Sequence, residues 1–359
     1  MKIERKELLA ALEPLKPALA TRSSVAELSH VWFDGEYAYA HDAGMGIRVR
    51  FESPLKFGVP GALLLGLVNQ ASADSLTLEE TDDALAFKSG RSNVKLATLP
   101  VERKIWPYPA KPNSKPVASL KVSEDFLKAL KRVFVVHPAS PKRMEHHSVC
   151  LFAMQKEMDV YTTDSASLAF MPVEEPITGK VSSLAVPRPF AEQISAQCVA
   201  GATLEYYSDH YALEASDKIS LYSNVFDTSG MEDLPSYADK HSDAAVSPPF
   251  EIPKELNATL ERAVLMAGPE KSVVKLRTDG KKLFLKGKFK FGELDEEFAL
   301  TASLPKVSID VLANILLALK DVNRMMIAPE ALTLRGEDGF MYIVAKYGYE
   351  SSKPREGRD

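Results

Sequence analysis

Few residue patterns in this sequence could carry catalysis. Two stretches, 92–95 and 272–275, have the Ser-x-x-Lys spacing of a serine nucleophile activated by a lysine. Both lie in alternating patterns typical of strands instead of at a helix start, and the companion Ser-Asp-Asn and Lys-Thr-Gly motifs are absent. The sequence also lacks GxSxG, HExxH, GxGxxG and P-loop motifs. We therefore expect a protein without enzymatic activity.

No pattern indicates a metal or cofactor site. His146 and His147 are adjacent, and adjacent strand residues point to opposite faces, so the two rings make a poor ligand pair. The acidic run 292–297 is better explained as the polar edge of a strand. Cys150 and Cys198 have no CxxC spacing and cannot form a disulfide framework, which suits a reducing cytoplasm. We expect no metal, no cofactor and a cytoplasmic location.

One order of elements occurs three times along the chain. An amphipathic helix is followed by alternating strands, a second amphipathic helix, and two strands joined by a tight polar turn. The first helices begin near residues 5, 123 and 253, the second near 60, 187 and 308, and the strand–turn–strand units at Asp83, His210 and Ala331. A period of roughly 120 residues suits three copies of one domain. Each copy is expected to be α+β, with helices on one face of an antiparallel sheet.

Two irregular segments separate the copies. The first, 101–119, is rich in proline, and the second, 240–249, is polar and ends in two prolines. The predicted domains are therefore 1–118, 119–247 and 248–350, with a polar tail at 351–359 that we expect to be disordered.

Composition limits the kind of nucleic-acid partner without excluding one. Hydrophobic residues make up 45% of the chain and charged residues 26%, as in ordinary globular proteins. The apolar run beginning at Ala62 is far shorter than the ~18 residues of a membrane span, so no membrane is expected. A net charge of −5 argues against binding DNA with the whole surface, because phosphates are neutralised by Lys and Arg. A local basic surface remains compatible with it.

Four motifs in register carry a resemblance to a known family. They are SGRSNVKLATLP at 89–100, a Thr-Thr-Asp followed by a leucine at 163–168, LPSY at 234–237 and VNRMMIAP at 322–329. Over 1–349 the chain resembles the bacterial DNA polymerase III beta subunit, the beta sliding clamp. Its local departures are typical of a diverged member, of bacterial or phage origin.

The resemblance implies a fold and a function. The fold is the DNA clamp, with three repeated domains per chain, helices lining the inside of a ring and antiparallel sheets outside. The function is that of a processivity factor: a head-to-tail homodimer encircles double-stranded DNA and tethers DNA polymerase and clamp loader through short peptide motifs. The alternative is a non-catalytic scaffold of clamp-like fold that does not encircle DNA.

The resemblance also implies sites for DNA and for the second subunit. Expected phosphate contacts are helix cations and cations of two loops: Arg22, Lys128, Lys131, Arg132, Lys142, Arg143, His146, Arg188, Lys254 and Arg262. The expected dimer interface joins the end of the first domain to the third domain of the partner. Its residues are Arg91, Val94, Lys95, Leu96, Leu265, Met266, Glu293, Glu296 and Glu297.

A pocket for partner peptides is implied between the second and third domains. Its expected residues are Thr163, Ser165, Ala166, Ser167, Leu168, Pro235, Tyr237, Val344, Ala345, Lys346 and Tyr347. The family usually has Gly-His-Arg at 165–167 and a Met-Pro-Met-like ending at 345–347. This chain lacks the basic side chain and has Tyr347, which changes the charge and the shape of the site, so we expect an altered peptide preference. It also continues to Asp359.

Overall fold

The chain divides into two compact units, which are described separately. The computed structural model describes residues 1–21, 23–81, 83–108, 114–136, 148–164, 166–225, 233–243, 248–268, 270–319 and 321–348. The first unit holds the described residues of 1–130, 153–158 and 174–227. The second holds those of 131–152, 159–173 and 228–359.

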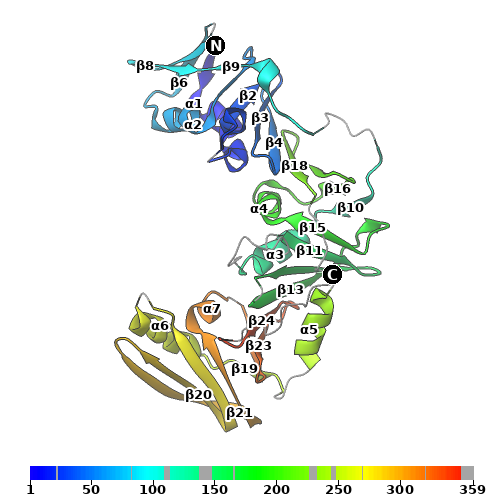
Figure 1. Cartoon of the computed structure of the whole chain (residues 1–359), viewed down its shortest axis with the longest axis vertical. Coiled ribbons are helices and arrows are strands. Elements are labelled where there is room, and N and C mark those ends of the chain that lie inside the picture. The colour runs from blue at the N-terminus through cyan, green and yellow to red at the C-terminus, as the bar shows by residue number, and fades with distance from the viewer. Residues whose placement is uncertain are drawn as a thin grey trace, which may run out of the picture. The chain divides into compact units, whose positions relative to one another are not determined.

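The first unit contains two antiparallel sheets with helices packed against them (Figure 1). The smaller sheet has the order β1-β6-β7-β8, and the larger has the order β14-β10-β16-β17-β18-β4-β3-β2-β5-β9. The strands of this unit are β1 (Lys2–Glu4), β2 (His30–Phe33), β3 (Tyr37–His41), β4 (Met45–Arg50), β5 (Phe57–Pro60), β6 (Ser75–Glu80), β7 (Ala84–Ser89), β8 (Ser92–Ala97), β9 (Leu99–Pro100), β10 (Ala118–Lys121), β14 (Thr178–Gly179), β15 (Ser183–Pro187), β16 (Thr203–Tyr206), β17 (His210–Glu214) and β18 (Ile219–Asn224). Its helices are α1 (Arg5–Leu12), α2 (Gly61–Gln70), α4 (Arg188–Gln197) and the 3₁₀ helices η1 (Glu13–Ala18), η2 (Ala26–Ser29) and η3 (Val101–Arg103).

The second unit contains most of β11 and β12, all of β13, and every element from α5 onward. Neighbouring strands run in the order β11-β12-β13-β24-β23-β22-β19, and β20 and β21 form a long separate hairpin. The strands are β11 (Ser148–Ala153), β12 (Met158–Thr163), β13 (Ser167–Val173), β19 (Phe250–Glu251), β20 (Val273–Phe289), β21 (Gly292–Leu312), β22 (Arg324–Ile327), β23 (Ala331–Arg335) and β24 (Met341–Ala345). The helices are α5 (Leu234–Asp243), α6 (Leu256–Ala267) and α7 (Ala313–Leu317), while α3 (Glu124–Val133) has residues in both units.

Local sequence explains where the helices begin. Pro60 and Pro187 end a strand and precede α2 and α4, with φ values of −54° and −53° that suit a chain entering a helix. Before α3, the Ser123 hydroxyl accepts the Phe126 N–H at 3.1 Å and so satisfies one of the unpaired donors of the first turn. The helix then buries Phe126, Ala129, Leu130 and Val133, the i, i+3, i+4, i+7 spacing of one face.

The predicted helix near residue 308 is wrong in its first half. Residues 308–312 are the last residues of β21, and only Ala313–Leu317 are helical. Val307, Ile309 and Val311 are buried and alternate with Ser308 and Asp310, which is the period of a strand. The second helix of this repeat is therefore five residues long, whereas α2 and α4 have ten each.

Two further elements differ from the sequence prediction. The helix expected over 5–19 is α-helical only to Leu12 and continues as η1, because Pro14 and Pro17 remove backbone donors there. The LPSY motif at 234–237 begins a ten-residue helix, α5, that the polar composition of the segment did not indicate. The tail at 351–359 lies outside the described residues, and the three-domain division stays a prediction.

Tight packing between two strands of the first unit gives a stability prediction. Gly58 of β5 lies opposite Trp32 of β2, and a Cβ atom on Gly58 would lie 2.6 Å from the buried indole. We expect Gly58→Ala to lower the free energy of unfolding by about 1–3 kcal/mol, because the indole must shift. The matched control is Gly66→Ala in α2, where nothing lies within 4 Å of the added atom. That change should stabilise by up to about 1 kcal/mol through helix propensity, and thermal unfolding of both variants compares the two effects.

Candidate subunit interface, DNA-contact and peptide sites

Two strand pairs join successive repeats, and both have the same register. In the first unit β18 pairs antiparallel with β4, and in the second unit β24 pairs antiparallel with β13. We call them joint 1 and joint 2. The partners in joint 1 are Ser223–Met45, Tyr222–Gly46, Leu221–Ile47 and Ser220–Arg48, and those in joint 2 are Val344–Ser167, Ile343–Leu168, Tyr342–Ala169 and Met341–Phe170.

The turns beside the joints define which positions are equivalent. Met45 and Ser167 each accept the N–H of an aspartate three residues earlier and so close the turn before β4 and β13. Ile219 and Phe340 close the turns before β18 and β24, and each accepts the N–H of the residue four positions earlier, Ala215 and Gly336. In both joints, the residue four positions after the one that closes the second turn lies opposite the residue that closes the first turn. Ser223 thus pairs with Met45, and Val344 pairs with Ser167. The register of a joint is therefore fixed by backbone geometry, whatever the side chains.

Two further strands correspond to those that meet in joints 1 and 2, but one edge of each has no strand partner within the described part of the chain. β8 pairs with β7, and the 292–299 portion of β21 pairs with β20. Gly292 closes its turn opposite Phe289, as Met45 and Ser167 do, and Ser92 closes its turn opposite Ser89. An open edge presents unpaired N–H and C=O groups that another strand can satisfy.

The two open edges carry opposite charge. Arg91 and Lys95 are exposed at β8, and Glu293, Asp295 and Glu297 are on one face of β21 because they alternate along it. On β20, lysines already line the other side of this acidic row. The pairs are Lys288–Glu293 at 2.9 Å, Lys286–Asp295 at 2.6 Å and Lys282–Glu297 at 2.6 Å.

Glu296, predicted for the interface, faces the other side of the sheet. It accepts the Thr259 hydroxyl at 2.6 Å and pairs with Arg262 at 2.5 Å. The Thr259 hydrogen bond and the nearby guanidinium hold the pKa of Glu296 below its usual value. Glu296 and Arg262 therefore neutralise each other beside α6, while Leu96 is buried in its own sheet and Val94 is half-buried.

The equivalent helices α2 and α4 differ in how they are covered. In α4, Phe190 is fully buried near the ring of Tyr211, and Gln197 donates to the carbonyl of Pro14 in η1 at 3.3 Å. Leu63 of α2, at the position of Phe190, is 59% exposed. Next to it a cavity of about 580 Å³ lies between α2, η1 and the segment 19–21. Leu63 was not predicted as a site residue. The sequence does hold a signal for it, because the leucines of α2 lie on more than one face of the helix and so indicate more than one apolar surface.

A second uncovered apolar surface lies at the end of α6. Leu265 is 78% exposed, Met266 is half-buried, and Phe291 at the tip of the β20–β21 hairpin is 66% exposed. The Phe291 N–H donates to the Met266 carbonyl at 3.3 Å, which holds the hairpin tip against the helix end. Leu265 and Met266 were predicted and Phe291 was not, although an aromatic residue in a polar hairpin turn is an available signal.

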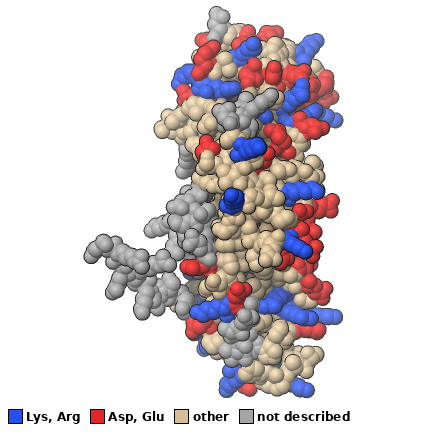
Figure 2. Space-filling model, turned by 90° about the vertical axis from the view of Figure 1, so that its right-hand side faces the viewer, with Lys and Arg blue, Asp and Glu red and all other residues tan. Residues whose placement is uncertain are grey.

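The predicted DNA-contact cations have different surroundings. Lys128, Lys131 and Lys254 are exposed on or beside helices. Arg188 is buried and pairs with Glu192 at 3.0 Å, so its guanidinium is part of the packing of α4. Arg22, Lys142, Arg143 and His146 lie outside the described residues. Figure 2 shows basic and acidic side chains interspersed on the face that it displays.

Arg132 is part of an internal network of the second unit. Its Nε lies 3.3 Å from an Asp338 oxygen, its Nη2 donates to the Asp321 carbonyl at 3.1 Å, and its guanidinium lies 4.3 Å from the centre of the Phe340 ring. With 14% of its side chain exposed, it holds the end of α3 to the segment after α7 and the β23–β24 turn. We therefore do not retain Arg132 as a phosphate contact.

Joint 2 brings together most of the predicted peptide-pocket residues. Leu168, Ser167 and Val344 are buried in the β13–β24 pair, and the Ala345 N–H donates to the Ala166 carbonyl at 2.8 Å. The Thr163 hydroxyl donates to the Ser167 carbonyl at 2.8 Å. These side chains close the sheet, and among them only Ala166 is exposed. Ser165 lies outside the described residues.

The remaining pocket residues are separate from the joint. Pro235 and Tyr237 are on α5, where the exposed Tyr237 ring lies 4.4 Å from that of His241. The Lys346 N–H donates to the Glu330 carbonyl and that of Tyr347 to the Asp310 carbonyl. The exposed Tyr347 ring also lies 5.4 Å from the Lys271 ammonium. The structure thus places the two exposed tyrosines on different elements.

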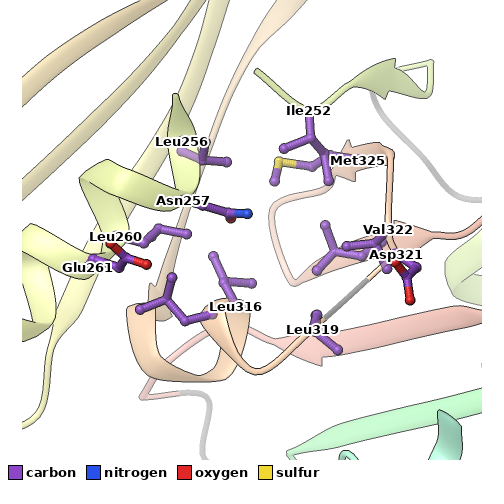
Figure 3. A pocket seen from close by; sticks show the side chains of 12 residues that line it. Ile252, Leu256, Asn257, Leu260, Glu261, Leu316, Leu319, Asp321, Val322 and Met325 are labelled. Atoms are coloured by element: carbon purple, nitrogen blue, oxygen red, sulfur yellow. The ribbon is translucent and has the colours of Figure 1, made fainter. Parts of the chain in front are cut away.

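A cavity of about 350 Å³ in the second unit was not predicted (Figure 3). Leu256 and Leu260 of α6 line one side, Leu316 of α7 the floor, and Ile252 and Met325 the opposite side. α7 is five residues long and ends at Leu317, whereas α2 and α4 have ten residues each.

Comparison with solved structures identifies the fold. Neither a protein-family model nor a curated protein matches the sequence. A DNA polymerase III beta subunit from Thermotoga maritima matches with a TM-score of 0.81 and 16% identity, covering 97% of this chain and 99% of that one. The fold is that of the beta sliding clamp.

Two other clamp structures agree over the same length. A putative DNA polymerase III beta subunit from Eubacterium rectale has a TM-score of 0.80 at 13% identity, covering 97% of this chain and 99% of that one. The Helicobacter pylori beta clamp bound to a DNA ligase peptide has a TM-score of 0.79 at 17% identity, covering 96% and 99%. The predicted α+β clamp fold is confirmed.

No group of three or more His, Cys, Asp or Glu side chains among the described residues could hold a metal ion. No helix in the described part of the chain is long and apolar enough to cross a membrane.

The surroundings of Arg132 give a test of its role. We expect Arg132→Ala to destabilise the protein by about 1–3 kcal/mol, because Asp338 loses a largely buried charged partner. Lys131→Ala, one residue away and exposed, should change stability by less than about 0.5 kcal/mol. Chemical denaturation of the two variants compares them, and equal stabilities would contradict the structural role.

Proposed function

We propose that this protein is a DNA sliding clamp that acts as a polymerase processivity factor. Two copies form a head-to-tail ring around double-stranded DNA, with three repeats from each chain. The observation that carries the proposal is the pair of open, oppositely charged strand edges on a beta-clamp fold. A third joint, between two chains, would satisfy both edges and repeat the geometry of joints 1 and 2.

The shared register predicts the residue pairs of this third joint. With the same offset from the turns as in joints 1 and 2, Leu96 lies opposite Gly292 of the partner subunit. Because the pairing is antiparallel, each preceding residue of β8 lies opposite the next residue of β21. The predicted pairs are Lys95–Glu293, Val94–Leu294, Asn93–Asp295, Ser92–Glu296 and, just beyond the strand, Arg91–Glu297. Two opposite-charge pairs and one apolar pair thus meet without any adjustment of register.

Charge would be arranged in three rows across this joint. The acidic row of β21 would have the lysines of β20 on one side and Arg91 and Lys95 of the partner on the other. Glu293 and Glu297 then have a cation on both neighbouring strands, while Asp295 has Lys286 on one side and lies opposite Asn93 on the other. Such pairs at the edge of an interface mainly select the correct partner and register.

Apolar surface would supply most of the affinity. Joint 1 places α4 against η1, so the same geometry places α2 against the end of the partner's α6. The exposed Leu63 of one chain then covers the exposed surface around Leu265 and Phe291 of the other. At about 25 cal/mol per Å² of buried apolar area, these side chains contribute several kcal/mol per joint.

DNA would be held chiefly by the closed ring. A ring that slides requires few phosphate contacts, and these are independent of base sequence. Lys128, Lys131 and Lys254 are the described cations that we propose for this role, together with Arg22, Lys142, Arg143 and His146. Arg188 and Arg262 have carboxylate partners within the chain, which weakens the case for them.

Partner proteins would bind beside joint 2. A Helicobacter pylori clamp of this fold binds a DNA ligase peptide, and we propose that DNA polymerase and clamp loader use short peptides here as well. Tyr237, Ala166 and Tyr347 are the exposed candidates for contact, and Lys346 is half-buried. Leu168 and Val344 support the site from inside the sheet. A non-catalytic scaffold that does not encircle DNA remains the alternative function.

Topological retention on DNA separates the two functions. Val94→Cys with Leu294→Cys places thiols at a predicted apolar pair, and a short bismaleimide applied with nicked circular DNA should lock the ring shut. The locked complex should survive high salt on the circle and be lost after a restriction enzyme cuts the DNA, because salt breaks ion pairs but not a topological link. Loss from the uncut circle in high salt would support the scaffold.

Charge reversal tests the register itself. Lys95→Glu should place two acids opposite each other in both joints of the ring, at roughly 1 kcal/mol each, and so weaken the dimer Kd by roughly 30-fold. Adding Glu293→Lys should restore dimerisation, because the pair is recreated with its signs exchanged. The matched control is Lys95→Glu with Asp295→Lys, which should restore less. Sedimentation equilibrium measures all three, and equal rescue by both second changes would refute the register.

A further inference from the structure

A segment between the first two repeats lies directly on joint 1. After η3, Trp106 and Tyr108 pack on β3, β4 and β18 within the first unit. The Trp106 ring centre is 5.0 Å from that of Tyr39 and 5.5 Å from that of Tyr222. Tyr108 stacks on Tyr222 with 5.2 Å between ring centres. Together the two side chains cover strands from both sides of the joint.

Polar contacts tie the segment to both sides of joint 1, because the Tyr108 hydroxyl can donate its proton to an acceptor on either side. The Tyr108 hydroxyl lies 3.3 Å from the Gly44 carbonyl in the β3–β4 turn and 3.1 Å from the Asn224 side-chain oxygen at the end of β18. Lys104 holds the start of the segment, with its ammonium 3.2 Å from Asp34 and 3.9 Å from the centre of the Tyr39 ring.

The contact with the joint leaves no free space. Gly46 lies opposite Tyr222 in joint 1, and a Cβ atom on it would be 2.7 Å from Tyr108 and 2.9 Å from Trp106. The two rings thus touch the backbone of β4 at a paired position. Separation of β4 from β18 requires Trp106 and Tyr108 to leave.

A histidine without hydrogen bonds lies beneath the two rings. His41 ends β3 and is 7% exposed, with its ring centre 6.3 Å from that of Trp106 and 5.7 Å from that of Tyr108. Neither of its ring nitrogens has a hydrogen-bond partner within the described part of the chain. A proton added to this ring would create a buried charge with no acceptor.

The charged and titratable groups around His41 come from each element packed there. Asp42 follows His41, Tyr39 of β3 lies against Trp106 and Lys104, and Arg48 of β4 lies over Tyr222 of β18. Tyr108 contacts His41, Tyr222 and His210 of β17, and His210 pairs with Asp209. The Asp42 carboxylate is occupied in accepting the Gly44 and Met45 N–H groups at 3.0 and 2.8 Å. Burial lowers the pKa of His41, and the Asp42 charge opposes that shift.

We propose that Trp106 and Tyr108 form an acid-sensitive latch on joint 1, released when His41 takes up a proton. The closed latch needs the neutral ring, and the open latch lets water reach it. Because the pKa of His41 is lower in the closed state, the open state binds the proton more tightly. The latch is closed above the ordinary histidine pKa of about 6.5 and loosens as the pH falls below it. This inference is independent of the proposed clamp function.

Joint 2 is held differently and serves as an internal control. Arg132 connects it through Asp338 and Phe340, whereas joint 1 is covered by the Trp106 and Tyr108 rings, which lie against His41. A latch effect should therefore appear in β4 and β18 and be absent from β13 and β24.

Fluorescence and hydrogen exchange test the latch. Trp32→Phe leaves Trp106 as the single tryptophan, since the chain has two. Between pH 7.5 and 5.0 we expect Trp106 emission to move to longer wavelength as the ring becomes solvated. Over the same range, amides of β4 and β18 should lose protection after correction for intrinsic exchange. Those of β13 and β24 should keep it. Unchanged Trp106 emission, or equal loss in both joints, would overturn the proposal.

Two variants test whether His41 and Tyr108 are responsible for the pH-dependent opening. His41→Leu keeps an apolar group beneath the rings and should abolish the pH transition. A transition that persists with the same midpoint would refute the role of His41. Tyr108→Phe keeps the ring but removes the hydroxyl that donates to the Asn224 side-chain oxygen or the Gly44 carbonyl, so β4 and β18 should exchange faster already at pH 7.5. Unchanged exchange in that variant would refute the latch even if His41→Leu fails to fold.

Discussion

Backbone pairing between the last strand of one repeat and a central strand of the repeat before it organises this protein. Joints 1 and 2 satisfy the same row of N–H and C=O groups in the same register, although their side chains have little in common. Tyr222 and Gly46 meet in one joint, and Ile343 and Leu168 in the other. Because the constraint is carried by main-chain groups, sequences can diverge widely around it. This explains how the fold is kept at 13–17% identity to solved clamps.

Much of the fold follows from the sequence, because strand alternation and repeated order are local signals. The strand–turn–strand units, α3 and the proline-preceded starts of α2 and α4 could all be predicted. The end of β21 could not, because the apolar residues of 307–312 fit a helix face almost as well as a strand face. Only its pairing with β20 decides between them.

The candidate sites were less predictable for a different reason. The role of Arg132 depends on Asp321 and Asp338, which lie 189 and 206 residues further along the chain. The exposure of Leu63 and Phe291 likewise depends on distant residues, because it arises where no other part of the described chain packs over these side chains. No local sequence pattern indicates this. Sequence resemblance indicated which strands to expect at the subunit interface, since a strand keeps its place in the fold, and this interface stays a prediction. It could not distinguish cations that face solvent from cations with partners within the chain.

The two kinds of strand pairing also set an order for folding during synthesis. The β20–β21 hairpin closes a two-residue turn, so it can form as soon as its residues leave the ribosome. Joint 1 pairs Arg48 with Ser220, a separation of 172 residues. The edge of β4 must therefore stay open while the whole central repeat is made. During that interval Trp106 and Tyr108 lack Tyr222, and the nascent chain exposes an unpaired strand beside loose aromatic side chains, a surface suited to chaperone binding.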